Sequence, residues 1–247
     1  METSIIYNED CFEGMKKIKD KSIDLVITDP PYWHKKSPGK PYSQRKQCHT
    51  SSTFSNSSLY NAEGYMMSNM SCFDENNIHA LLSECKRVCK IPNIYLFCNE
   101  TQVPYYTMWA ENNGLMFSIL IWEKPLSIIN KNRFSQNVEF IIRIYDYGTA
   151  LNRLPVNIMY NRVQKYKPLC GSEKIHATQK PVEIMLSYIQ LSSNEGDIVL
   201  DPFIGSGTTA IACVMANRRY IGFEINKDYY DAALRRIKVE QSQLKLF

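Results

Sequence analysis

The first segment whose residue types could do chemistry is a short apolar run followed directly by a rigid, acidic turn, which we call the acidic corner. Residues from Ile23 onward read as a buried strand that leads directly into Asp29–Tyr32, with the sequence Asp-Pro-Pro-Tyr. Two consecutive prolines stiffen the backbone and remove two N–H donors, which leaves carbonyl groups free to accept hydrogen bonds from a ligand. Asp29 adds a carboxylate at the carboxyl end of the expected strand, where α/β sheets bind ligands. The corner suits a planar group with an exocyclic NH2; a rigid turn that only ends a strand is the alternative.

The second such segment is a glycine-rich turn that follows another apolar run, Ile198–Asp201. Gly205 and Gly207 allow a sharp turn and a close approach of the backbone to a ligand. No lysine follows at the place that a Walker loop requires, but the pattern G-x-G-x-x-A is a dinucleotide fingerprint. Glu224 ends the next expected strand, 23 residues after Asp201, where a carboxylate binds both hydroxyls of a ribose. The segment predicts a nucleoside-containing cofactor, either NAD or S-adenosylmethionine; a turn that only packs a helix on a sheet is the alternative.

The place of this turn in the chain argues against a dehydrogenase. A dehydrogenase fingerprint opens its sheet, whereas only about 37 residues follow Ala210 here, enough for one strand and one helix. Earlier parts of the chain must therefore complete the sheet, in a permuted order.

Short apolar runs alternate with longer amphipathic ones along the chain, which is typical of an α/β fold. We expect seven strands, at Ser4–Tyr7, Ile23–Thr28, Asn93–Cys98, Leu115–Trp122, Val138–Tyr145, Ile198–Asp201 and Tyr220–Glu224. We expect helices at Cys11–Ile18, Asn76–Cys89, Gln102–Asn112, Pro181–Leu191, Thr208–Ala216 and Lys227–Gln241. The fourth and fifth strands follow each other without room for a long helix, so they should form an antiparallel pair.

Composition narrows the class of protein. The 247 residues are 44% hydrophobic and 22% charged, as in ordinary globular proteins, and the length allows a single domain over residues 1–247. No apolar run approaches the ~18 residues that span a bilayer, and no signal peptide is visible, so we expect no membrane and a cytoplasmic protein. The eight cysteines are scattered and read as free thiols, and no metal site is expected.

The positive charge is concentrated in two stretches. The net charge is +4, but residues 33–62 carry +5 and residues 151–180 carry +5, so the rest of the chain carries 4 − 10 = −6. Such a distribution suits a polyanion such as a nucleic acid; two solvated loops are the alternative. We expect a mobile basic loop at 33–75. The candidate DNA contacts are Lys35, Lys36, Lys40, Arg45, Lys46, Arg153, Arg162, Lys165 and Lys167.

Three motifs together resemble a known family. Asp-Pro-Pro-Tyr at 29–32, DPFIGSGTT at 201–209 and HATQKPVEIM at 176–185 are similar to the amino-methyltransferases of DNA, and their order resembles the β-group of these enzymes. The resemblance covers most of the chain and departs at 33–75 and at 149–175, a short segment that would hold the target-recognition region. It implies a seven-stranded, mostly parallel Rossmann-like sheet with helices on both faces and one antiparallel terminal strand.

The resemblance also implies residue roles toward S-adenosylmethionine. The glycine turn would cradle its methionine part, Glu224 its ribose and Asp10 its adenine, while residues 178–180 would contact its carboxylate. Cys11 as a small core residue, and 178–180 as a helix cap, are the alternatives. The implied cofactor-binding residues are Asp10, Cys11, Asp29, Thr178, Gln179, Lys180, Asp201, Phe203, Gly205, Ser206, Gly207, Thr208, Thr209 and Glu224.

The resemblance implies methylation of the exocyclic N6 of a flipped adenine by direct in-line attack, with Asp29, Pro30, Pro31 and Tyr32 as the catalytic residues. Aspartate is more usual in adenine enzymes of this kind, and serine in N4-cytosine enzymes. N4-cytosine methylation is the alternative, followed by a non-catalytic DNA-binding partner subunit of the same fold. The expected partner is double-stranded DNA; single-stranded DNA, a homodimer, a restriction partner and a bacterial or phage source are left open.

Overall fold

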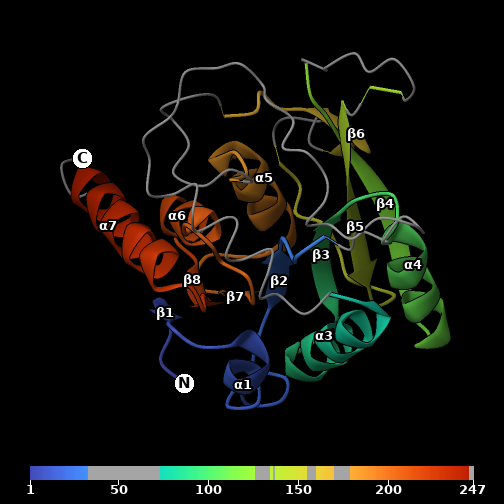
Figure 1. Ribbon diagram of the computed structural model, residues 1–247, viewed down its shortest axis with the longest axis horizontal. Coiled ribbons are helices and arrows are strands. Elements are labelled where there is room, and N and C mark those ends of the chain that lie inside the picture. The colour runs from blue at the N-terminus through green and yellow to red at the C-terminus, as the bar shows by residue number, and fades with distance from the viewer. Residues whose placement is uncertain (33–72, 126–133, 136, 155–159, 170–178, 245–247) are drawn as a thin grey trace, which may run out of the picture.

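An eight-stranded sheet forms the centre of the computed structural model, which describes residues 1–32, 73–125, 134–135, 137–154, 160–169 and 179–244 (Figure 1). The strand order is β1-β8-β7-β2-β3-β5-β4-β6. The strands are β1 (Ile5–Tyr7), β2 (Leu25–Thr28), β3 (Asn93–Cys98), β4 (Met116–Glu123), β5 (Val138–Tyr145), β6 (Val163–Lys165), β7 (Ile198–Asp201) and β8 (Arg219–Phe223). The glycine-turn strand β7 lies between β8 and β2, so the two ends of the chain interleave and the permuted order is confirmed.

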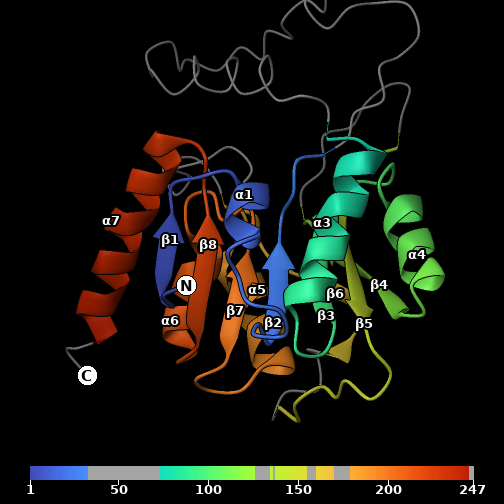
Figure 2. The ribbon, with the colours of Figure 1, turned by 90° about the horizontal axis from the view of Figure 1, so that it is seen from below.

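Helices cover both faces of the sheet, as expected. They are α1 (Cys11–Met15), α3 (Glu75–Val88), α4 (Val103–Asn112), α5 (Val182–Ser192), α6 (Thr208–Met215) and α7 (Lys227–Leu244). One hydrophobic cluster joins α1, α3 and α4 to one face, and a second joins α5, α6 and α7 to the other. Figure 2 shows α1 and α3 on the near side of the sheet, with α5 and α6 behind it. No helix in the described ranges is long and apolar enough to cross a membrane.

The burial of the central strands explains why they read as continuous apolar runs. Every residue of β2 and β3 is buried, because helices lie on both sides of these strands. The pairs β1–β8, β8–β7, β7–β2 and β2–β3 are parallel. Their carboxyl ends therefore meet at one edge of the sheet, where the acidic residues singled out in the sequence are placed.

Two details of the expected sheet are wrong. The sheet has an eighth strand, β6, which pairs in parallel with β4 inside the 149–175 segment. Its sequence gives no apolar signal, because Val163 and Lys165 are exposed and the buried residue between them is the polar Gln164. The antiparallel strand β5 lies between β3 and β4 rather than at the end of the sheet. The connection through α4 leaves a gap of one strand between β3 and β4, and β5 runs antiparallel to both and fills that gap.

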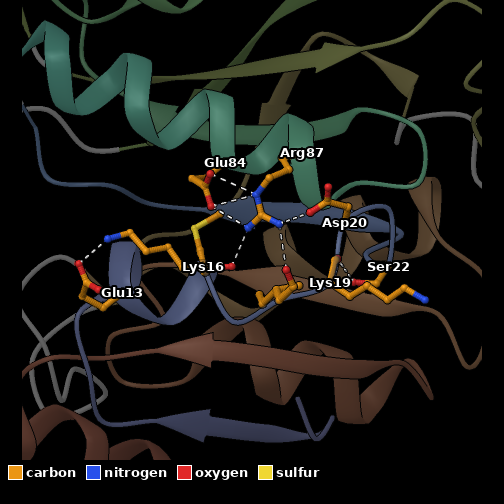
Figure 3. Close-up of polar contacts among 9 residues, drawn as sticks. Glu13, Lys16, Lys19, Asp20, Ser22, Glu84 and Arg87 are labelled. Carbon is orange, nitrogen blue, oxygen red and sulfur yellow. Dashed lines mark hydrogen bonds and ion pairs between the residues drawn. The ribbon is translucent and has the colours of Figure 1, made fainter.

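A cluster around Arg87 of α3 fixes the connection between α1 and β2 (Figure 3). The guanidinium donates to the backbone oxygens of Met15, at 2.7 Å, and Ile18, at 2.9 Å. It also pairs with Glu84 at 2.7 Å and with Asp20 at 2.5 Å. The helix α1 ends at Met15 rather than at the expected Ile18, and Arg87 satisfies the carbonyl of this last helical residue and that of Ile18 in the connection after it. We call Arg87, Glu84, Asp20 and these two carbonyls the Arg87 cluster.

Candidate active site

The two turns singled out in the sequence lie side by side at the carboxyl edge of the sheet. Asp29 follows β2 and Asp201 ends β7, and these strands are neighbours. The Thr28 hydroxyl donates to Asp201 Oδ1 at 2.6 Å, which joins the base of one turn to the base of the other. The sheet thus brings together residues that are more than 170 positions apart in sequence.

Asp201 organises the glycine turn through both of its carboxylate oxygens. Oδ2 accepts from the Thr209 hydroxyl at 2.5 Å, and Oδ1 accepts from the Phe203 amide at 3.1 Å as well as from Thr28. Burial raises the pKa of Asp201 to about 6, against the lowering effect of these hydrogen bonds. The carboxylate therefore holds β2, the turn and the start of α6 in one arrangement.

The glycine turn itself is shaped by close packing of α7. Gly205 and Gly207 have φ values of 54° and 85°, the left-handed region that favours glycine. A Cβ on Gly207 would lie 2.9 Å from the Cβ of Ala233 in α7. Arg236, also in α7, donates to the Ser206 backbone oxygen at 2.6 Å. Gly207 is the N-cap of α6 and supplies no side-chain acceptor, so no capping side chain occupies the first amides of the helix.

Glu224 and Asp10 lie at neighbouring strand ends beside this turn. Glu224 is 8% exposed, and its Oε1 accepts from the Asn226 amide at 2.7 Å. Burial raises the pKa of Glu224 to about 7, against hydrogen bonds from the backbone of Asn226 and Gly205. The Asn8 side chain donates to the Glu224 backbone oxygen at 2.7 Å, which places the start of α1 next to the end of β8.

Asp10 and Cys11 have definite structural roles at the start of α1. Asp10 is the N-cap, and its Oδ1 accepts from the amides of Phe12 at 2.9 Å and Glu13 at 3.2 Å. Cys11 is 6% exposed and belongs to the hydrophobic cluster, and burial raises the pKa of its thiol to about 12. Cys11 is therefore a neutral, packed side chain beside the expected adenine position.

The acidic corner contains a buried lysine that joins three side chains. Lys180 Nζ lies 2.5 Å from Asp29 Oδ2, 3.2 Å from Glu139 Oε1 and 3.3 Å from the Tyr32 hydroxyl. The Tyr32 hydroxyl donates to Glu139 Oε1 at 2.6 Å, and Lys124 Nζ lies 3.0 Å from Glu139 Oε2. The Lys180 side chain is only 5% exposed. We call these five residues the Lys180 cluster.

The opposite charges in the Lys180 cluster stabilise the ionised forms of Lys180 and Glu139. Burial acts to lower the pKa of Lys180, but the carboxylates of Asp29 and Glu139 outweigh it and raise the pKa. Burial acts to raise the pKa of Glu139, but Lys180 and Lys124 outweigh it and lower the pKa. The pKa of Tyr32 is well above its ordinary value, because the phenol is buried beside these two carboxylates. Tyr32 is therefore a neutral hydroxyl that donates to Glu139.

Asp29 differs from its partners because one of its two carboxylate oxygens accepts no hydrogen bond from the described residues. Oδ2 is bound by Lys180, whereas Oδ1 is buried and has no hydrogen-bond partner among the described residues. Burial raises the pKa of Asp29, opposed by Lys180 and assisted by Glu139. An unsatisfied buried acceptor costs about 1–3 kcal/mol, so this oxygen is a binding point for a donor that arrives with a ligand. The Pro31 carbonyl, by contrast, already accepts from Gln102 Nε2 at 3.1 Å.

The structure brings together most of the residues that the sequence singled out, with one difference. Lys180 contacts Asp29 here, whereas the resemblance assigns it to the carboxylate end of the cofactor. Thr178 and the loop lysines and arginine at 35, 36, 40, 45 and 46 lie outside the described residues. Arg153, Arg162, Lys165 and Lys167 are exposed. Lys165 pairs with Glu123 at the carboxyl end of β4, on the same edge of the sheet as Asp29.

Sequence reasoning missed Glu139 and Lys124, which complete the corner. Glu139 and Arg143 are the two charged residues of the strand VEFIIRIY. The charge of Glu139 was the available signal, because an acidic side chain inside a largely buried strand needs a partner. Lys124 directly follows β4 and gives no comparable signal.

Comparisons with known proteins agree with this geometry. Residues 23–235 match the family model described as DNA methylase. The chain is 32% identical to the type II methyltransferase M.HpaI of Haemophilus parainfluenzae, over 92% of this chain and 72% of that protein. It is 26% identical to the DNA adenine methyltransferase YhdJ of Escherichia coli K12, over 96% and 84%.

Solved structures show the same architecture. The complex of M1.HpyAVI with SAM superposes with a TM-score of 0.65 at 25% identity, over 94% of this chain and 98% of that one. The cytosine-N4-specific PvuII DNA methyltransferase gives a TM-score of 0.68 at 15% identity, over 96% and 86%, which shows the shared fold. The chain belongs to the DNA methylase family.

Proposed function

We propose that this protein transfers a methyl group from S-adenosylmethionine to the exocyclic N6 of adenine in double-stranded DNA. The observation that carries the proposal is the buried Oδ1 of Asp29, an acceptor without a described protein partner, beside a glycine turn built for a cofactor. Family membership supports transfer to DNA. Residues 1–247 would act as one methyltransferase domain.

The residues around the glycine turn fit S-adenosylmethionine, which supplies a methyl group on a positively charged sulfur. Glu224 is a buried carboxylate whose ionised form accepts hydrogen bonds from ribose hydroxyls. Asp10, next to it in space, would accept from the adenine amino group. The first amides of α6 favour a carboxylate, because a helix N-terminus attracts negative charge. Gln179 and the residue before it would complete the contact to the methionine end. M1.HpyAVI, a structural relative, binds SAM.

The acidic corner would prepare the amine for attack. Asp29 Oδ1 accepts one amine hydrogen, and the Pro30 carbonyl accepts the other. These two bonds draw the nitrogen toward tetrahedral geometry, so that its lone pair is available for in-line displacement. The Asp29 carboxylate also stabilises the positive charge that develops on the nitrogen. Tyr32 would stack on the base, which must leave the duplex at a cost of a few kcal/mol.

Two observations support adenine over cytosine as the target. Position 29 is an aspartate, which the resemblance associates with N6-adenine methylation. The Escherichia coli relative YhdJ is named as a DNA adenine methyltransferase, whereas the cytosine-N4-specific relative shares only 15% identity and supports the fold alone.

DNA would lie across the carboxyl edge of the sheet. Arg162, Lys165 and Lys167 are exposed around β6, whose carboxyl end is on the same edge as Asp29. Lysine and arginine side chains there would bind phosphates. The segments 33–75 and 149–175 would supply further contacts and target recognition.

Expression in a methylation-deficient bacterial host tests the proposal. Genomic DNA from this host is digested to nucleosides and analysed by mass spectrometry, and single-molecule sequencing gives the sequence context. We expect N6-methyladenine in one recurring context with the wild-type protein, and none with Asp29→Ala. N4-methylcytosine as the product would overturn the adenine assignment, and unmodified DNA in the presence of folded, cofactor-binding protein would overturn methyl transfer.

A further inference from the structure

The Lys180 ammonium is fully engaged inside the protein. An ammonium has three donor hydrogens, and Lys180 has three acceptors within 3.3 Å: Asp29 Oδ2, Glu139 Oε1 and the Tyr32 hydroxyl. Its ammonium also lies 5.4 Å from the ring centres of both Tyr32 and Phe97. All of these contacts are to the acidic corner and its surroundings, and they define what Lys180 does in this structure.

The contact with Lys180 determines how Asp29 presents its carboxylate. With Oδ2 bound to Lys180 and Oδ1 unbound by the described residues, rotation of the carboxylate would break a buried ion pair. A single oxygen thus stays available in a fixed direction. The positive charge of Lys180 also favours the ionised form of Asp29 against its burial.

Glu139 connects the remaining members of the corner. Its Oε1 accepts from both Tyr32 and Lys180, and its Oε2 pairs with Lys124. The four charged groups of the cluster, Asp29, Glu139, Lys180 and Lys124, sum to zero. Glu139 therefore acts by holding Lys180 and Tyr32 in place beside Asp29 rather than by adding net charge.

We propose that Lys180 and Glu139 are positioning residues for methyl transfer: Lys180 fixes Asp29 with one oxygen toward the amine, and Glu139 fixes Lys180 and Tyr32. The inference rests on the proposed function, because it concerns the same site. It reassigns Lys180 from the cofactor to the catalytic aspartate and gives a role to Glu139.

Other titratable groups face Asp29 from the elements packed around it. Cys98 at the end of β3 and Tyr106 of α4 are neutral, because burial raises the pKa of each above its ordinary value. Asp201 at the end of β7 is the remaining acid, with a pKa of about 6. These groups are the same in every variant below, so differences between variants report on Lys180 and Glu139.

The test measures single-turnover methyl transfer against pH, at saturating cofactor, on a duplex that contains the mapped target site. The variants are Lys180→Met and Glu139→Gln. Lys90→Met is the matched control, because Lys90 also pairs with a carboxylate, Asp24 at 2.7 Å, but at the opposite end of β2. Affinity for S-adenosylmethionine is measured by calorimetry, and thermal unfolding shows that each variant is folded.

The two variants should move the acidic limb of the pH profile in opposite directions. Lys180→Met removes a cation that lowers the pKa of Asp29, so the limb should move to higher pH and the rate should fall about 100-fold. Glu139→Gln removes an anion that raises this pKa, so the limb should move to lower pH, with a rate loss of about 10-fold. Cofactor affinity should stay within about 3-fold of wild type, and Lys90→Met should resemble wild type throughout.

A different pattern would overturn the inference. If Lys180→Met weakened cofactor binding about 100-fold but kept the wild-type rate at saturation, Lys180 would be a ligand of the cofactor carboxylate. If the acidic limb stayed at the wild-type pH in both variants, neither residue would act on Asp29. Should Lys180→Met fail to fold, Glu139→Gln still tests the shift of the limb, and Lys180→Arg, which keeps the charge, should leave the limb in place while slowing transfer through its different geometry. A wild-type protein without methyl transfer would instead contradict the proposed function itself.

Discussion

The Lys180 cluster and the Arg87 cluster are both built around one cation between two carboxylates, and they differ in their access to water. The Arg87 side chain is 28% exposed and its partner Asp20 is 71% exposed. The Lys180 side chain is 5% exposed, and its partners Asp29 and Glu139 are 20% and 13% exposed. The first cluster joins α3 to the connection after α1, and the second lies at the carboxyl edge of the sheet.

The two clusters also differ in what they leave unsatisfied. Arg87 directs a planar set of donors at two carbonyls and two carboxylates, and solvent reaches the acids. In the Lys180 cluster, one oxygen of Asp29 is buried without a partner in the described structure. Similar chemistry thus stabilises a loop where water is present and prepares a binding point where water is excluded. The comparison predicts that substitutions in the two clusters will have different kinds of effect.

The largest difference should appear in activity when an acid of each cluster is neutralised. Asp29→Asn removes the anion that faces the amine, so methyl transfer should fall by about 10³-fold or more. Glu84→Gln in the Arg87 cluster keeps a hydrogen-bonding side chain far from the carboxyl edge and should leave the rate near wild type. Radiolabelled methyl incorporation into DNA measures both. Equal losses in the two variants would contradict a functional distinction between the clusters.

The next difference concerns stability. Lys180→Met leaves two buried carboxylates without their shared cation, which should lower the free energy of unfolding by about 3–5 kcal/mol. Urea denaturation followed by circular dichroism measures the change. A loss under about 1 kcal/mol would show that water reaches the corner, as it does at exposed ion pairs.

A third prediction concerns the cofactor side of the same edge. The pKa of Glu224 is about 7, above its ordinary value, so the carboxylate gains protons as the pH falls from 8 to 6. Because the ionised form binds ribose hydroxyls, affinity for S-adenosylmethionine should weaken by up to about 10-fold over this range. Glu224→Gln should bind more weakly at pH 8 and lose this dependence, which calorimetry can measure. A wild-type affinity that is constant from pH 8 to 6 would contradict the role of Glu224.

The raised pKa of Glu224 also predicts how the stability of the folded protein depends on pH. Glu224 binds a proton more readily in the folded protein than in the unfolded chain, so its contribution to stability is greatest below the ordinary glutamate pKa. That contribution is lost as the pH rises toward about 7. Glu224→Gln should therefore stabilise the protein at pH 8 while weakening the cofactor, and thermal unfolding at two pH values separates these effects.

The smallest effect should come from Arg87→Lys. Lysine keeps the charge but loses the planar set of donors, so about 1 kcal/mol of stability should be lost. The pH profile of methyl transfer should not change, because Arg87 contacts Met15, Ile18, Glu84 and Asp20, none of which belongs to the site. A changed profile would show that the Arg87 cluster is coupled to the site.

Much of this architecture could be predicted from local sequence patterns. The strands β3, β5 and β7 are rich in apolar residues, and the structure places them at the expected bounds. The strand β6 could not be predicted, because it buries one polar residue and depends on its pairing with β4. The position of β5 in the sheet could not be predicted either, because its neighbours depend on the path of the chain through α4.

The site was predictable to the level of its two turns but not of its contacts. The rigidity of Asp29–Tyr32 and the left-handed glycines are local properties, visible in a few consecutive residues. The partners of Lys180 come from two separate parts of the chain, the turn 29–32 and β5, and sequence spacing carries no information about the distances between them. Glu139 was therefore missed, although an acidic side chain in a largely apolar strand indicated a partner.

The most direct test is a crystal structure of the protein with a non-reactive analogue of S-adenosylmethionine and a duplex containing the target site. We predict that Asp29 Oδ1 lies within about 2.7–3.2 Å of the exocyclic nitrogen of an extruded adenine, with Lys180 still bound to Oδ2 and Glu139. A structure in which Lys180 has left Asp29 for the analogue's carboxylate, or in which the extruded base lies away from Asp29, would contradict this account.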